Sequence, residues 1–216
     1  MKLVGPIARH ARRIGIVTVL ILLSTLAIAA PARADFIWPP RGWCGPHTTG
    51  GPWYEILASE VNPTLTHFMS LNIAPGTTGE RTETLTKVSS VSTTIGGSVE
   101  VSSSAGAIFT KVSVKVGFSV QNTRASTDTE TTSMRWSFNE PGYYGLYKGT
   151  RAVSGEYTWF RCLRHDLGPL GVAYNVVREG TQTYTTFDNI EVGTVRCGDV
   201  VPMGTLRFKA RLQLGC

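Results

Sequence analysis

Three of the four histidines, His47, His67 and His165, lie outside the first 34 residues, and histidine is the side chain best suited to acid–base chemistry near neutral pH. His165 is followed by Asp166, a pair that could form part of a Ser-His-Asp triad. Neighbouring residues on a strand point to opposite faces, however, so we do not expect the two to act together. The sequence contains no G-x-S-x-G, H-E-x-x-H or phosphate-binding-loop motif. We therefore predict a protein that is not an enzyme and uses no small-molecule cofactor.

The first 34 residues have the three parts of a secretory leader. Four basic residues precede an apolar run at 14–30, and Ala32-Arg33-Ala34 then places small residues where a signal peptidase cuts. The alternative is a transmembrane anchor, because the run approaches the ~20 residues that span a bilayer. The cleavage motif directly after the run favours removal of the leader. We predict a secreted, extracellular protein in which residues 35–216 form a single β-rich domain.

Removal of this leader changes the net charge. The chain has 21 Lys and Arg against 15 Asp and Glu, a formal charge of +6, and residues 1–34 hold five of the basic residues and no acidic one. The remaining part has 16 basic and 15 acidic side chains, a net charge of +1. A nearly neutral chain lacks the basic surface that nucleic acids require, so we expect no nucleic-acid partner.

All four cysteines lie after the leader, at Cys44, Cys162, Cys197 and Cys216. An even number of cysteines in an exported chain is typical of disulfides, here two, for which three pairings are possible. A zinc site is the alternative, but no two cysteines have the spacing of a zinc knuckle and only His165 lies near one of them. We therefore predict two disulfides and no metal. Residues 45–161 contain no cysteine, so the disulfides would join the start of the exported chain to its last third.

The stretch 36–54 is rich in Pro and Gly, which prevent a regular helix. Its aromatic residues include Trp38, Trp43, Trp53 and Tyr54. Such rings could form a platform for a sugar or a lipid headgroup, or they could cap the end of a β-sheet core, which we favour. Residues 55–60 then predict a short helix, which Pro63 would end.

Residues 80–138 are dominated by Ser, Thr and Val and contain no Pro or Cys, a composition that favours long strands. Apolar residues occupy odd positions up to 101 and even positions from 108, with Val88 and Phe109 as exceptions. Such alternation is typical of strands with one apolar face. If the two arms fold back around 102–107, odd positions meet even ones and the apolar residues share a face. That face would comprise Val91, Ile95, Val99, Val101, Ile108, Val112, Val114, Val116, Phe118 and Val120.

Further strands are expected at 123–138, 153–162, 171–177, 181–187 and 206–214. The sequence thus predicts an all-β fold. In it, an elongated antiparallel sheet with long Ser/Thr-rich strands and an amphipathic hairpin is capped by a disulfide-stapled, aromatic-rich end.

The stretch from Thr82 to Phe138 resembles the insertion region of aerolysin-like β-pore-forming proteins, including the group related to epsilon toxin and mosquitocidal toxin. The resemblance lies in the alternating Ser/Thr-rich segments 88–101 and 111–120. It implies a soluble form whose hairpin joins those of other copies in a transmembrane barrel. It covers about 57 residues and is compositional, and apart from 36–75 the chain has no room for a receptor-binding lobe. Small exported bacterial proteins with Ser/Thr/Val-rich hairpins are similar to the chain to the same degree.

Two functions follow from these patterns. The first is a small pore-forming or membrane-perturbing protein that acts through the hairpin at 85–120. The alternative is a secreted, non-enzymatic protein that binds a surface or assembles with itself. The expected partners are membrane lipid, a surface receptor or further copies of the chain.

Overall fold

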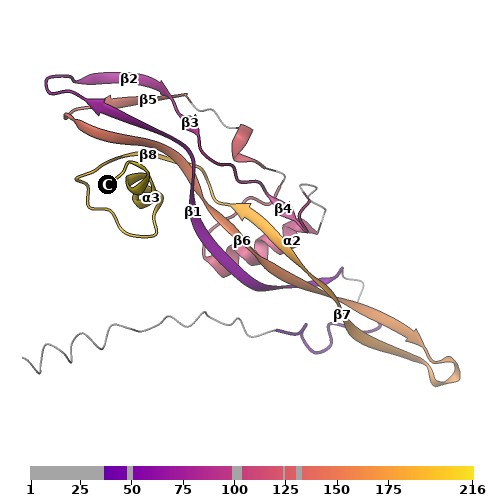
Figure 1. Cartoon of the computed structure of the whole chain (residues 1–216). Helices are drawn as coiled ribbons and strands as arrows, with labels where there is room; N and C mark the ends of the chain where they lie inside the picture. The colour runs from indigo at the N-terminus through magenta and orange to yellow at the C-terminus, as the bar shows by residue number, and fades with distance from the viewer. Residues whose placement is uncertain (1–36, 48–50, 99–103, 124, 130–132) are drawn as a thin grey trace, which may run out of the picture. The chain divides into compact units, whose positions relative to one another are not determined.

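The computed structural model describes residues 37–216 apart from 48–50, 99–103, 124 and 130–132 (Figure 1). In this part of the chain most residues belong to antiparallel strands, against which two short α-helices pack. In chain order the elements are β1 (Trp53–Ile73), β2 (Gly79–Thr84), β3 (Thr86–Lys87), β4 (Thr94–Ile95), α2 (Ala105–Val116), η1 (Thr127–Thr129), β5 (Ser133–Phe138), β6 (Gly142–Asp166), η2 (Gly168–Leu170), β7 (Val172–Phe187), β8 (Glu191–Arg196) and α3 (Leu206–Gln213).

The two longest strands, β1 and β6, pair antiparallel at the centre of the main sheet. Pairing runs from Trp53 opposite Phe160 to Ile73 opposite Gly142, so it uses the whole length of β1. β6 has 25 residues and β1 has 21, against a usual ~3–10 for strands in globular proteins. The prediction of long antiparallel strands is confirmed.

The other edge of β6 is shared by two strands that follow each other in the chain. β7 pairs with residues 152–166 of β6, and β8 pairs with residues 144–149. The short strands β3 and β4 add to the outer edges of β1 and β7. β2 and β5 form a separate two-stranded sheet. The region 80–138, which was predicted to supply the long strands, therefore contributes only short ones.

The segment 105–116, predicted as the second arm of the hairpin, is the helix α2. Its buried residues, Ala105, Ile108, Phe109 and Val112, follow the i, i+3, i+4, i+7 spacing of one helical face. They pack on buried side chains of β1, β6 and β7. Phe109, the exception to the alternation, is fully buried here, with its ring 6.4 Å from that of Tyr184. The helical period therefore explains a residue that the strand period does not.

A glycine ends α2 at the point where the predicted strand would have continued. Gly117 adopts a left-handed backbone conformation with φ of 79°, and its N–H donates to the carbonyl of Ser113. The remaining residues of the segment then turn back toward the sheet.

The predicted apolar face is consequently split, and the hairpin prediction is wrong. Ile108 and Val112 are buried in α2, whereas Val114 lies on the opposite side of the helix with 81% of its surface exposed. Val99 and Val101 lie outside the described residues. The alternation of Ser, Thr and Val did not reveal which of two periods the tertiary packing would use.

Two further expectations are corrected in the same way. Residues 55–60 belong to β1 and not to a helix, because a six-residue signal is too short to nucleate a helix against pairing with β6. Residues 206–213, expected as a strand, form α3. Its hydrophobic residues recur every fourth position, at Leu206, Ala210 and Leu214, and Thr205 caps the helix by accepting a bond from the Phe208 N–H.

Candidate functional site

The four cysteines form the two predicted disulfides, and the structure assigns their pairing. Cys44 is bonded to Cys162 and Cys197 to Cys216. The first joins the N-terminal segment to β6, and the second joins the end of β8 to the chain terminus. Two disulfides fit an oxidising environment such as the cell exterior.

The predicted hairpin residues outside α2 also lie apart from one another. Val91 is buried beside Thr127, whose hydroxyl oxygen accepts its N–H, and Ile95 pairs with Tyr184. Phe118 lies under the guanidinium group of Arg151, 3.8 Å from the ring centre. Val116, Phe118 and Val120 are partly buried against the α2 cluster. These residues serve packing in this structure and form no common membrane-facing surface.

Three of the four predicted surface aromatics pack against other rings or a cation. Trp43 and Trp53 make an edge-to-face contact at 6.4 Å, and the Lys111 ammonium lies 3.9 Å from the centre of the Trp53 ring. Tyr54 packs on Tyr157 at 6.1 Å. These contacts support the capping hypothesis for the three residues.

The buried histidine His67 was examined as a catalytic group. It lies between Lys87 of β3 and Lys148 of β6 in the strand register, and its Nδ1 is 3.1 Å from the Thr66 hydroxyl. Burial and then the two lysines hold the pKa of His67 below its ordinary value, so the ring is neutral at pH 7. With only 3% of the residue exposed, His67 is closed to a substrate and acts as a structural residue.

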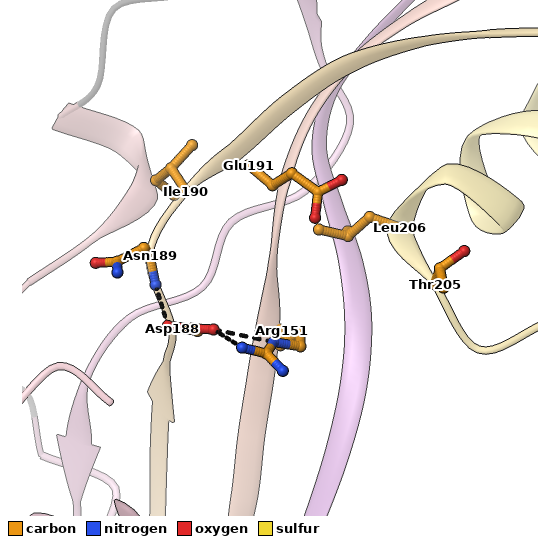
Figure 2. Close-up of a pocket in the computed structure, with 7 residues that line it drawn as sticks. All are labelled: Arg151, Asp188, Asn189, Ile190, Glu191, Thr205 and Leu206. Atoms are coloured by element: carbon orange, nitrogen blue, oxygen red, sulfur yellow. Dashed lines mark hydrogen bonds and ion pairs between the residues drawn. The ribbon is translucent and has the colours of Figure 1, made fainter. Parts of the chain in front are cut away.

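A charged pocket lies where β7 gives way to β8 (Figure 2). It has a volume of about 560 Å³ and is lined by Arg151, Asp188, Asn189, Ile190, Glu191, Thr205 and Leu206. Asp188 accepts two hydrogen bonds from the guanidinium of Arg151, whose face covers Phe118, and Glu191 accepts one from the Tyr147 hydroxyl. The pocket's ionic groups are thus engaged by neighbouring protein groups. Their evident role is to hold the β7–β8 junction against β6.

The tip of the β6–β7 hairpin has the opposite character, because its apolar side chains face solvent. β1 ends its pairing at Phe160, and in the described part of the chain only β7 pairs with the remaining residues of β6, up to Asp166. Figure 1 shows this two-stranded ribbon extending past the start of β1. The turn Leu167-Gly168-Pro169-Leu170-Gly171 closes it. Leu170 is 87% exposed, Leu167 48% and Val172 40%.

The N-terminal segment adds further apolar surface to this end of the sheet. Trp38 packs on Phe160 with ring centres 5.0 Å apart, and the Cys44–Cys162 disulfide fixes the segment to the same strand. Trp38 nevertheless remains 55% exposed. We call the resulting surface the hairpin end and define it by its exposed apolar residues Ile37, Trp38, Leu167, Leu170, Val172 and Val177.

Most ionic side chains near the hairpin end are basic. The ribbon carries Arg161, Arg164 and Arg178, and the acidic residues beside them are Asp166 and Glu179. Sequence analysis selected Trp38 but missed the leucines. The available signal was a Leu-Gly-Pro-Leu-Gly turn between two strand-like segments, which predicts a hairpin but not the exposure of its tip.

Among the described residues, no three His, Cys, Asp or Glu side chains lie close enough to hold a metal ion. Nor does that part of the chain contain a helix both long and apolar enough to cross a bilayer. No protein-family model, curated protein or solved structure matches the chain.

Proposed function

We propose that this is an exported, non-enzymatic protein that binds membrane surfaces through the hairpin end. The observation that carries the proposal is the exposure of Leu167 and Leu170 at the tip of a ribbon with Trp38 beside its base. Exposed leucines at a turn contribute nothing to the core, and a partly exposed tryptophan is typical of groups at a membrane interface.

The apolar contribution to such binding is modest. Full burial of one large apolar side chain contributes about 1.5–3 kcal/mol. Scaled by the exposed fractions of Leu167, Leu170, Val172 and Trp38, transfer to lipid contributes about 4 kcal/mol. That corresponds to a Kd of about 1 mM, so the hairpin end alone supports a reversible, peripheral contact.

Vesicle flotation tests the proposal. The secreted form of the chain, purified from culture medium, is mixed with vesicles of phosphatidylcholine alone or with phosphatidylglycerol added, and is then centrifuged in a density gradient. We expect the protein to rise with at least one kind of vesicle. A protein that stays at the bottom of the gradient with both kinds would contradict the proposed function.

Pore formation is a separate prediction, since the hairpin from which it was derived is not formed by the described residues. It would require α2 to leave the sheet and extend. Release of a dye trapped in the same vesicles measures it directly. Binding without release would support the surface-binding function alone, and release would support the pore-forming one as well.

A further inference from the structure

We infer that the hairpin end is selective for acidic phospholipid headgroups, which the arginines of the ribbon contact while the leucines enter the bilayer. The inference rests on the proposed function and names the ligand of the same surface. It depends on three features: the distance of the arginines from the tip, their distribution over both faces, and their remaining hydrogen-bonding capacity.

The distance from tip to arginine matches the depth of a membrane interface. Arg164 precedes Leu167 by three residues, and at ~3.3 Å per residue its Cα lies about 10 Å back along the ribbon. Interfacial apolar groups enter the headgroup and acyl boundary by about 5–10 Å. When Leu167 and Leu170 reach that depth, the guanidinium of Arg164 lies at the level of the lipid phosphates.

The arginines occupy both faces of the ribbon. Residues directly opposite each other on paired strands share a face, so Arg164 lies on the face of Tyr174 and Arg161 on that of Val177. Phe160 pairs with Arg178, which therefore shares the face of Arg164. A ribbon that enters a bilayer tip first would meet phosphates on both sides.

The arginines retain capacity for phosphate. Arg164 is exposed and makes no ion pair with the described residues, whereas Arg178 donates to the hydroxyls of Thr158 and Thr181. Arg161 has a 3.4 Å contact with Glu179 and stays mostly exposed. Planar guanidinium groups bind phosphate through two parallel hydrogen bonds.

One acidic group near the tip opposes the attraction. Asp166 accepts a hydrogen bond from the Gly168 N–H, which stabilises the turn that presents the leucines. With Arg41 of the N-terminal segment, the four arginines of this end outnumber its two acidic residues, so the local net charge is +2. Each basic residue near an anionic membrane surface strengthens binding by about fivefold.

The experiment measures partitioning of the secreted chain onto vesicles of phosphatidylcholine alone and vesicles with 30 mol % phosphatidylglycerol, at low and at 0.5 M salt. Leu170→Asp is compared with Met203→Asp, whose side chain is 83% exposed in the loop after β8. Arg164→Gln is compared with Lys209→Gln, an exposed residue of α3 with the same charge. Neither position in each pair is buried, so all four variants are expected to fold.

We expect tighter binding to the anionic vesicles, with the difference lost at high salt. Leu170→Asp should weaken binding more than tenfold and Arg164→Gln about fivefold on anionic vesicles only, while both control variants bind like the unchanged protein. Equal binding to both vesicle types, or equal effects of Arg164→Gln and Lys209→Gln, would overturn the headgroup selectivity and leave membrane binding standing. Absence of binding to either vesicle would overturn the proposed function itself. Self-association of the unchanged protein that Leu170→Asp abolishes, without vesicle binding, would identify the surface as a contact between copies.

Discussion

Two valines two residues apart in α2 distinguish the observed helix from the hairpin that the sequence predicts. In the predicted strand, Val112 and Val114 point to the same face and are buried together. In the structure Val112 is fully buried, and Val114 is 81% exposed on the other side of α2. The perturbation is the same substitution at each position, Val112→Ala and Val114→Ala.

The expected magnitudes follow from these environments. Replacing a buried Val with Ala removes about two methylene equivalents, or ~1.6 kcal/mol of transfer free energy, and leaves a cavity that adds about 1 kcal/mol. The better helix propensity of Ala returns about 0.5 kcal/mol. Val112→Ala should therefore lower the free energy of unfolding by about 2 kcal/mol. At Val114 the small transfer loss and the propensity gain cancel, so the change should be close to zero.

Urea unfolding followed by tryptophan fluorescence and far-UV circular dichroism measures both values. A loss of ~2 kcal/mol in a domain of this size corresponds to a fall in Tm of about 5 °C. Equal destabilisation by the two substitutions would refute the placement of α2 and return these residues to a strand. Reversed effects would refute both arrangements.

Three further predictions concern other parts of the fold. Replacing Cys44 and Cys162 together with Ser should lower the free energy of unfolding by about 2–5 kcal/mol and weaken vesicle binding; unchanged stability and binding would show that the bridge does not hold the hairpin end. Because burial and two lysines lower the pKa of His67 in the folded state, its stabilising effect is present above its unfolded pKa of 6.5. That effect is lost as the pH falls toward the folded value, so His67→Gln should flatten the decline in stability between about pH 6.5 and 5, and an unaltered pH profile would contradict this. Gly155→Ala should destabilise the sheet strongly in thermal unfolding, since its Cβ would lie 2.1 Å from a β1 carbonyl oxygen, whereas Gly198→Ala, with open space around it, should change little; equal effects would refute the close strand contact.

Features set by local chemistry could be predicted from the sequence. The cysteine count and the apparent leader predicted two disulfides, which the structure contains. Their pairing could not be predicted, because it depends on which strands become neighbours. Cys44 and Cys162 are 118 residues apart in sequence. Long strands were likewise predicted, but from the wrong segment.

The error in α2 has a definite physical origin. Ile108 and Val112 belong both to the even-numbered set of a strand and to the i, i+4 set of a helix, so over 12 residues the two periods overlap. Only Phe109 separates them. β-branched residues favour a strand when considered alone, and packing against Tyr184 and the neighbouring strands overrides that local preference.

The hairpin end depended on a property that no local pattern contains. Leu170 is exposed because β1 begins at Trp53 and leaves the last residues of β6 with β7 as their neighbour among the described strands. The same turn inside a wider sheet could have been covered. Exposure therefore follows from where another strand begins, more than a hundred residues earlier in the chain.

The most direct test of membrane binding through the hairpin end is the fluorescence of an environment-sensitive label at position 170. Leu170→Cys, labelled with a nitrobenzoxadiazole group, is titrated with vesicles containing 30 mol % phosphatidylglycerol, and Met203→Cys carries the same label as the control. The emission at position 170 should rise and shift to the blue as the label enters lipid, while that at position 203 stays constant. An unchanged spectrum at position 170 on vesicles that bind the protein would contradict the assignment of this surface.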